Sequence, residues 1–200
     1  MQLFETSLHR VAIWGPPGSG KTTLAKDLAK ILGYQVFHSD NLYIKSNWKQ
    51  LRPESLRNKA IPLLRAEKWI IDGNFGELRD EVLEHATLVI ILNPPLLILL
   101  IRIFKRTLLS VTNGFKILRL FPPQIAVVTS GLTEIIPNIF IELIIISWRF
   151  KRKTFDYLYN KAANKLRKNS VLVLRRVKDV KDFLDNINTF FKDSSKNLLV

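Results

Sequence analysis

The sequence predicts a layered α/β domain built on a parallel sheet. Short apolar runs with turn residues after them are expected strands, and helical patterns separate most of them. This alternation of strands and helices is typical of parallel α/β sheets, and runs that are apolar throughout fit strands covered on both faces. The expected strands span 10–14, 34–37, 68–72, 87–92 and 170–174.

Boundary residues as well as periodicity mark the expected helices. The first has apolar residues at positions 24, 28 and 31 or 32, and Gly33 ends it. Pro53 and the Pro94-Pro95 pair suit helix starts, because proline is tolerated in the first helical turn. Pro62 is expected to disturb the helix that Pro53 opens. The expected helices span 21–32, 53–67, 94–109 and 177–187.

The stretch from Ser110 to Asn138 breaks this rhythm, because it contains Asn113-Gly114, Pro122-Pro123, Gly131 and Pro137. We interpret it as irregular and as part of a lid-like insertion at about 107–146. A single domain is expected over 1–192, with a frayed tail over 193–200.

Composition limits the class of protein further. The 200 residues suit one domain with a core of its own, and the absence of cysteine excludes disulfides and thiolate metal sites. A chain without cysteine fits a reducing cytoplasm, which we expect as the location. Residues 1–9 lack the apolar core of a signal peptide.

The net charge of +14 indicates anionic partners such as nucleotides, nucleic acid or anionic lipid. The charge is uneven along the chain. Residues 85–133 hold five Lys and Arg and no acid, and residues 149–176 hold ten against Asp156. A solvated basic surface and a functional one both explain this pattern.

Two apolar stretches are too short and too interrupted to be membrane-spanning helices. Asn93-Pro94-Pro95 interrupts residues 88–101, and Pro137 and Glu142 interrupt residues 135–148. Neither reaches the roughly 18 uninterrupted apolar residues of a spanning helix. Both are expected to be buried elements, with surface association of the second left open.

The clearest motif is G-x-x-x-x-G-K-[ST], which residues Gly15, Pro16, Pro17, Gly18, Ser19, Gly20, Lys21 and Thr22 match without exception. An expected strand enters it and an expected helix leaves it. Glycines allow backbone N–H groups to converge on phosphate oxygens at the helix N-terminus. Lys21 is expected to bind the β- and γ-phosphates of ATP, and Thr22 to bind Mg²⁺. Thr23 is expected to contact the α-phosphate or to cap the turn.

Carboxylates follow the second and third expected strands, where ligands bind in open parallel sheets. Asp72 is expected to orient Mg²⁺, and the alternative is a turn residue in Asp72-Gly-Asn74. Asp40 is expected to bind the acceptor or to act as its general base, and the alternative is a helix cap. Asn74 is a weaker candidate for substrate contact, and His38 is interpreted as structural.

Arg102 and Arg106 lie four residues apart on the helix expected after Pro95, so they share one face. Arginines there suit the added charge that phosphoryl transfer needs, and a solvated helix face is the alternative. Arg149 and Arg152 are similar but weaker candidates.

Taken together, these motifs resemble the DNA topology modulation (FlaR-type) proteins, which are adenylate-kinase-related P-loop proteins. The resemblance runs from about residue 11 to 187. Its motifs are Gly15–Thr22, His38-Ser-Asp40 with Tyr43 and Trp48, Trp69–Phe75, Arg102-x-x-x-Arg106, Trp148-Arg-Phe150 and Val171–Leu174. It implies a three-layer, nucleoside-monophosphate-kinase-like fold with sheet order 2-3-1-4-5, ATP binding, and kinase chemistry in which Arg102 and Arg106 match the lid-entry arginines. Between 107 and 146 this chain is more apolar than the family pattern.

Three hypotheses follow. The leading one is an ATP- and Mg²⁺-dependent kinase acting on a nucleotide or another small molecule. The second is a non-catalytic regulator that binds nucleic acid through the basic second half, with affinity that falls steeply with salt. The third is peripheral membrane attachment through residues 110–150, which a hydrophobic lid or a dimer interface would also explain.

Overall fold

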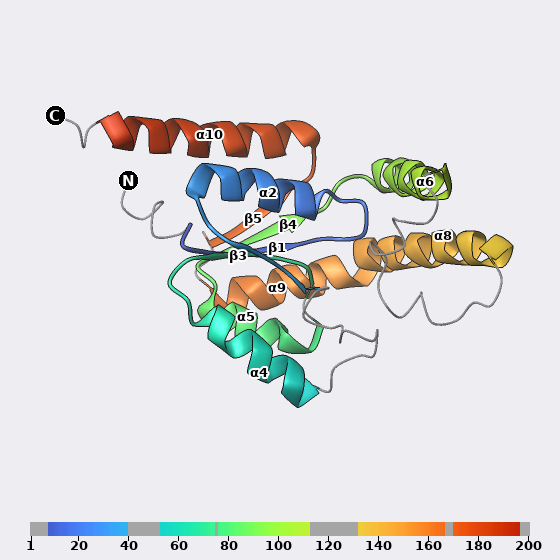
Figure 1. Ribbon diagram of the computed structural model, residues 1–200, viewed down its shortest axis with the longest axis horizontal. Coiled ribbons are helices and arrows are strands. Elements are labelled where there is room, and N and C mark those ends of the chain that lie inside the picture. The colour runs from blue at the N-terminus through green and yellow to red at the C-terminus, as the bar shows by residue number, and fades with distance from the viewer. Residues whose placement is uncertain (1–7, 40–52, 75, 113–131, 167–169, 197–200) are drawn as a thin grey trace.

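The computed structural model describes residues 8–39, 53–74, 76–112, 132–166 and 170–196 (Figure 1). Asp40, Tyr43 and Trp48, which the sequence singles out, lie outside these residues. So does the stretch 113–131 of the expected lid-like segment.

A parallel five-stranded sheet forms the centre of the described part, as expected. Its order is β2-β3-β1-β4-β5, which is the order that the family resemblance implies. β1 lies in the middle, with Ile13 opposite Asp72 of β3 and Ile90 of β4. The strands are β1 (Arg10–Trp14), β2 (Val36–His38), β3 (Trp69–Asp72), β4 (Leu88–Leu92) and β5 (Val171–Leu174).

Helices cover both faces of the sheet and make a three-layer molecule (Figure 1). Successive side chains of a strand point to opposite faces, so Ile13 enters one apolar core and Trp14 the other. Leu28 and Ile187 pack into the core of Ile13, and Leu158 into that of Trp14. The first core is covered by α2 (Lys21–Leu32) and α10 (Val177–Lys196), the second by α4 (Pro53–Leu64), α5 (Arg79–His85) and α9 (Phe155–Lys165).

Two further helices, α6 (Leu96–Thr112) and α8 (Leu132–Arg149), pack against each other and extend beyond the sheet (Figure 1). We call this pair the α6–α8 arm. A five-residue π-helix, η3 (Phe150–Thr154), joins α8 to α9, and a short 3₁₀ helix, η1 (Gly76–Leu78), precedes α5. The arm therefore leaves the sheet after β4 and returns to it before β5.

The expected helices form with shifted ends. α4 stops at Leu64 and accommodates Pro62 in its last turn, where the proline is exposed. α6 reaches Thr112, and α10 continues to Lys196, where a frayed tail was expected. A stripe of apolar residues that includes the buried Ile187 and runs to Phe191 holds α10 against the core that α2 covers.

Three helices were not expected. Residues 132–138 were interpreted as irregular because of Pro137, but they form the first turns of α8. α5 has only seven residues, and α9 buries only Leu158 and Ala162 among many polar side chains. Neither helix has a long apolar pattern in its sequence, so periodicity does not predict it.

The expectation that both apolar stretches are buried was only partly right. β4 is buried throughout, but Leu97 and Ile101 of α6 and Ile141, Ile145 and Trp148 of α8 are exposed. Among the described helices, none is long and apolar enough to cross a membrane.

Candidate functional site

The loop from Gly15 to Gly20 joins β1 to α2 and is closely packed on two sides. Gly15, Gly18 and Gly20 have φ values of 155°, 74° and 97°. A Cβ added at Gly15 would lie 2.8 Å from the carbonyl oxygen of Leu92, and one at Gly18 would lie 3.1 Å from Ile103 of α6. The loop thus needs glycine where it passes the end of β4 and the first turns of α6.

The first turn of α2 presents polar groups with no acidic residue among them. The Lys21 ammonium donates a hydrogen bond to the Pro16 carbonyl at 3.0 Å, so the side chain folds back over the loop. Thr22 and Thr23 are exposed, and no side chain caps the helix. Uncapped N–H groups at a helix N-terminus attract anions such as phosphate.

Asp72 lies at this turn, as the sequence predicted. The Thr22 hydroxyl donates to Asp72 Oδ2 at 2.6 Å, and His38 Nδ1 lies 3.0 Å from the same oxygen. Asp72 is buried, and its Oδ1 has no hydrogen-bond partner in the described part of the chain. A hydroxyl, a carboxylate and phosphate oxygens are the hard ligands that Mg²⁺ takes at nucleotide sites, so these residues fit that ion.

Asn74, which follows β3, supports the loop through its side-chain amide. Gly15 N–H donates to Asn74 Oδ1 at 3.0 Å, and Asn74 Nδ2 donates to the Gly15 carbonyl at 3.0 Å. Its amide is therefore taken up by the backbone of Gly15, which argues against the weaker prediction of substrate contact. The contact ties the end of β3 to the end of β1.

Arg102 of α6 reaches the other side of the loop. Its Nη1 donates to the carbonyls of Gly18 at 3.3 Å and Ser19 at 3.1 Å. Arg106 lies one turn further along α6 and is half-buried. The structure thus brings Arg102 to the loop from the side opposite Asp72.

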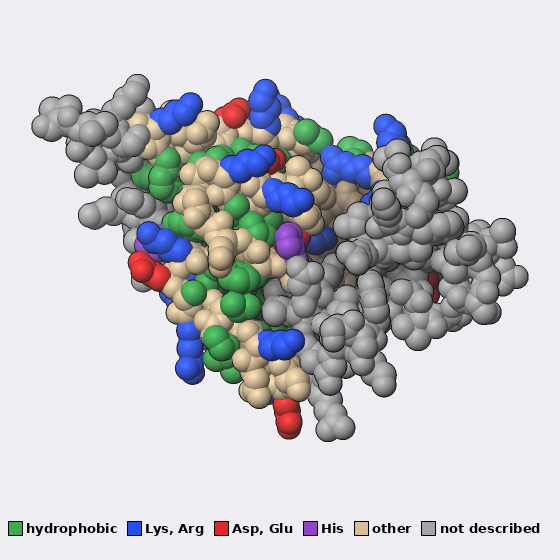
Figure 2. All heavy atoms as spheres, viewed as in Figure 1, with side chains coloured by type: hydrophobic (Ala, Val, Ile, Leu, Met, Phe, Trp, Pro, Cys, Tyr) green, Lys and Arg blue, Asp and Glu red, His purple; other side chains and the backbone are tan. Residues whose placement is uncertain are grey.

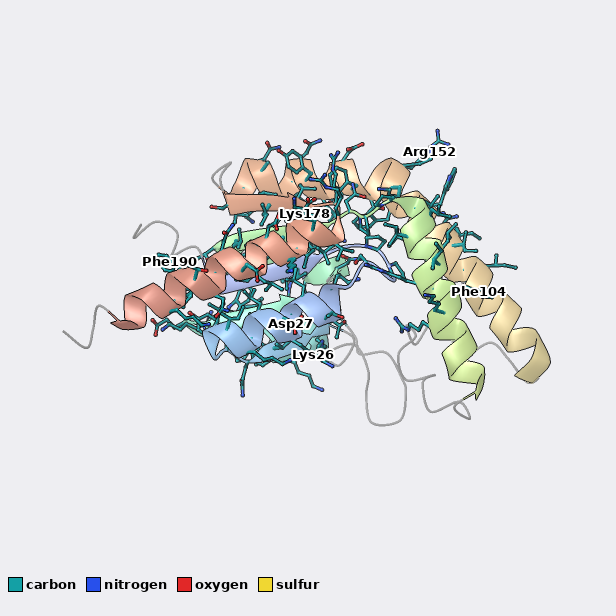
Figure 3. The ribbon with its side chains drawn as sticks, turned by 90° about the horizontal axis from the view of Figure 1, so that it is seen from above. Lys26, Asp27, Phe104, Arg152, Lys178 and Phe190 are labelled. Atoms are coloured by element: carbon teal, nitrogen blue, oxygen red, sulfur yellow. The ribbon has the colours of Figure 1, made fainter. Side chains whose placement is uncertain are left out.

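The weaker arginine candidates lie elsewhere. Arg149 is exposed, and the Arg152 guanidinium lies over the Trp148 ring, 5.1 Å from its centroid. Figure 3 shows Arg152 pointing outward, away from α2.

Lys151 is a residue that the sequence analysis missed. Its ammonium lies in η3 and donates to the Asn93 side chain at 2.7 Å and to the Asn93 carbonyl at 3.4 Å. Asn93 directly follows β4, and its backbone N–H donates a hydrogen bond to the Leu174 carbonyl at 2.9 Å. Burial, and then the nearby charge of Arg175, lower the pKa of Lys151. No spacing in the sequence links residues 93 and 151.

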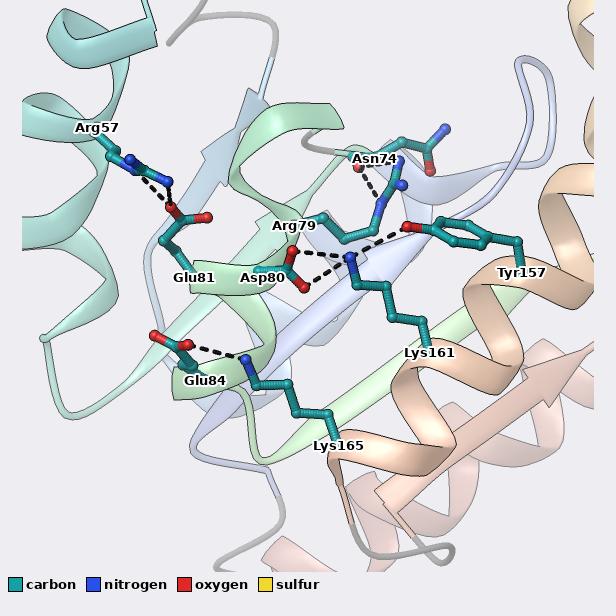
Figure 4. Close-up of polar contacts among 9 residues, drawn as sticks. All are labelled: Arg57, Asn74, Arg79, Asp80, Glu81, Glu84, Tyr157, Lys161 and Lys165. Carbon is teal, nitrogen blue, oxygen red and sulfur yellow. Dashed lines mark hydrogen bonds and ion pairs between the residues drawn. The ribbon is translucent and has the colours of Figure 1, made fainter.

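Arg79 is a second missed residue, and it connects Asn74 to a polar cluster between α5 and α9 (Figure 4). Its guanidinium donates to the Asn74 carbonyl at 3.3 Å and lies over the Tyr157 ring. The Lys161 ammonium donates hydrogen bonds to the Tyr157 hydroxyl at 3.2 Å and to the Asp80 carboxylate at 2.9 Å. These bonds from Lys161 lower the pKa of Tyr157 and the pKa of Asp80. The support of the loop thus extends to the helices on the far side of the sheet.

Residues 11–68, which include the loop, match the model of the family described as ATPase family associated with various cellular activities (AAA). The match covers well under half of the chain. No curated protein sequence matches the chain.

The fold is similar to that of shikimate kinase from Acinetobacter baumannii in complex with shikimate. The TM-score is 0.50 at 16% identity, over 94% of this chain and 96% of that one. A gluconokinase from Sinorhizobium meliloti 1021 gives 0.48 at 13% identity, over 96% and 97%. Deoxyadenosine kinase from M. mycoides with bound dCTP gives 0.36 at 17% identity, over 90% and 98%.

At these identities the first likeness shows the fold alone. Together with the strand order and the loop geometry, it establishes the chain as a P-loop protein with a nucleoside-kinase-like fold.

Proposed function

We propose that this chain is a kinase that transfers the γ-phosphoryl group of ATP to a nucleotide or another small molecule. The observation that carries the proposal is the Thr22–Asp72 contact at the N-terminus of α2, with Arg102 on the opposite side of the same loop. A protein that only binds ATP would need no more than the phosphate-binding loop. Phosphoryl transfer also needs a metal site and added positive charge, and both have candidate residues here.

In this proposal the backbone N–H groups of residues 15–23 and the Lys21 ammonium bind the phosphates of ATP. Thr22 and Asp72 hold Mg²⁺, which neutralises phosphate charge when it is bound. His38 fixes the Asp72 carboxylate through the oxygen that Thr22 also uses. Asn74 keeps Gly15 in place and so positions the N–H groups of the loop.

Arg102 and Arg106 stabilise the charge that develops as the phosphoryl group moves. Arginine suits this role because it stays ionised and donates in a planar fork. Asp40 binds the acceptor hydroxyl or accepts its proton. This role rests on its place one residue after Ser39, which is buried against Gly73 at the end of β3.

We further propose a single domain over 1–192, with a lid-like insertion at about 107–146, in a cytoplasmic protein of the FlaR type. The way Asn74 holds Gly15 supports the family assignment, since the Asp-Gly-Asn element is one of the motifs that point to it.

The test is phosphoryl transfer from labelled ATP to a panel of nucleoside monophosphates, sugars, small alcohols and shikimate. We expect transfer to at least one acceptor, dependent on Mg²⁺. Lys21→Ala and Asp72→Asn should lower kcat by about 10²- to 10³-fold, as expected when a group that stabilises developing charge is lost. Lys26→Ala is the matched control, because Lys26 is an exposed lysine on the same helix.

Absence of transfer to every acceptor, together with unchanged ATP affinity in Lys21→Ala, would overturn the proposal. Transfer that Lys21→Ala and Lys26→Ala reduce equally would show that the loop is not the site.

A further inference from the structure

Each helix of the α6–α8 arm carries an exposed apolar stripe with the same spacing. The exposed fractions are 68% for Leu97, 47% for Ile101 and 57% for Phe104 on α6, and 51% for Ile141, 39% for Ile145 and 48% for Trp148 on α8. Positions i, i+4 and i+7 share one helix face, so each set is a continuous stripe. Large apolar side chains gathered in this way mark interaction surfaces.

The stripe on α6 is separate from the side of the helix that packs into the protein. Leu99 and Ile103 are buried on the same helix, and Ile103 packs near Gly18 of the loop. At about 100° per residue, they lie on the side opposite Leu97, Ile101 and Phe104. Figure 3 shows Phe104 on the side of α6 turned away from α2.

The stripe on α8 has the same arrangement. Leu143 and Ser147 are buried, and Ile141, Ile145 and Trp148 lie on the opposite side of the helix. Both stripes therefore keep a large exposed area in the described part of the chain.

Cations border both stripes. Exposed Lys105 follows Phe104, exposed Arg149 follows Trp148, and the Arg152 guanidinium stacks on the Trp148 ring. Residues 96–106 and 141–154 contain seven Lys and Arg against one acid, Glu142. Lysine and arginine are also spread over the face of the molecule shown in Figure 2, with few acidic side chains between them.

We propose that the stripes of the α6–α8 arm dock on an anionic phospholipid surface. Apolar side chains, tryptophan and flanking cations on amphipathic helices are the composition of segments that lie in the membrane interface. A second copy of this chain is a poorer occupant, because two molecules of net charge +14 repel each other. Arg102 lies with the buried side of α6 on the loop, so docking leaves the candidate site uncovered.

The experiment is co-sedimentation of the full chain with vesicles of phosphatidylcholine alone or mixed with phosphatidylglycerol. We expect binding to the mixed vesicles that weakens with salt, and little to the neutral ones. The double variant Ile101→Glu, Ile145→Glu should lower the bound fraction by about tenfold or more, since both stripes lose an apolar contact and gain a negative charge. Val177→Glu is the control, because Val177 is an exposed apolar residue that lies on α10, outside the arm.

A second variant, Lys105→Glu with Lys153→Glu, leaves the stripes intact and should also weaken binding to the mixed vesicles. Circular dichroism of each variant confirms that it is folded. Failure of the unaltered chain to bind mixed vesicles, or equal loss in the double variant and in Val177→Glu, overturns the proposal. So does a dimer, detected by light scattering, that the double variant dissociates. Kinase activity plays no part in this readout, so either proposal can fail alone.

Discussion

At the scale of single residues, the Asn74–Gly15 pair is the most direct support of the loop. Asn74→Ala leaves the N–H and carbonyl of Gly15 without their partner at a part-buried position. We expect the free energy of unfolding to fall by about 1–3 kcal/mol, the cost of leaving such groups unpaired. ATP affinity should fall as well, because the loop loses its anchor.

Urea unfolding followed by circular dichroism measures this effect. Asn164→Ala is the control, since Asn164 is exposed on α9 and should change stability by no more than about 0.5 kcal/mol. Equal values for the two variants would mean that the pair does not hold the loop.

Two glycines with positive φ differ in the space that surrounds them. Gly73 has φ of 131°, and a Cβ there would clash with Ser39 Oγ, whereas a Cβ at Gly33 (φ 72°) would meet nothing within 4 Å. Gly33→Ala should therefore cost about 1–2 kcal/mol from the left-handed conformation alone. Gly73→Ala should cost about 1–3 kcal/mol more, because Ser39 has to move.

Thermal unfolding of both variants gives the comparison. If Gly73→Ala were no worse than Gly33→Ala, the close approach of β3 to Ser39 would be unimportant for stability.

At the scale of elements, the Lys151–Asn93 contact joins η3 to the end of β4 and has a pH signature. Burial and Arg175 lower the pKa of Lys151 below its ordinary 10.5, so the folded chain binds this proton less tightly than the unfolded chain. The contribution of Lys151 to the free energy of unfolding is therefore fully present above pH 10.5. It is lost as the pH falls through the lowered pKa of Lys151 in the folded chain.

Lys151→Met removes this titration and keeps most of the length of the side chain. The unfolding free energy of the unaltered chain minus that of Lys151→Met should therefore rise as the pH approaches 10.5. Chemical denaturation at a series of alkaline pH values measures the difference. A difference that stays flat or falls would contradict the burial of this ammonium.

Elements with one dominant local signal could be predicted from the sequence. The strands are short apolar runs, and the loop has its glycines and Lys21 in fixed spacing, so both were located correctly. The position of Asp72 at the loop followed from its place at a strand end in a parallel sheet. The structure confirms that position through the contact with Thr22.

What could not be predicted depends on contacts between distant residues or on which side of a helix is covered. Arg79 and Lys151 act through partners that no periodicity connects to them. The faces of α6 and α8 look alike in hydropathy, and burial of Leu99 but not Ile101 depends on where the loop lies. The pairing of the Asn74 amide with Gly15, which replaces the weaker prediction of substrate contact, is likewise a contact between distant residues.

At the scale of the whole molecule, the proposed site should stabilise the fold when it is filled. A ligand that binds the folded chain at about 100 times its Kd adds about 2.7 kcal/mol to the free energy of unfolding. For a chain of this size, that corresponds to a rise in Tm of roughly 5–10 °C. We expect this rise with ATP and Mg²⁺, a smaller one when EDTA removes the metal, and none in Lys21→Ala.

Differential scanning fluorimetry provides the measurement, with Lys26→Ala as the variant that should respond like the unaltered chain. An equal rise in Lys21→Ala would place the bound nucleotide away from the loop.

The central place of β1 also affects the order in which the molecule can assemble as it leaves the ribosome. β1 is among the first described segments to emerge, but its neighbour β4 ends only at Leu92, and the helix that packs near Gly18 follows later still. Until then one edge of β1 exposes unpaired backbone groups, which is a hazard for misassembly. Asn74, which holds Gly15 from the β3 side, emerges before β4. This edge of β1 therefore stays open to wrong pairing until β4 has been synthesised.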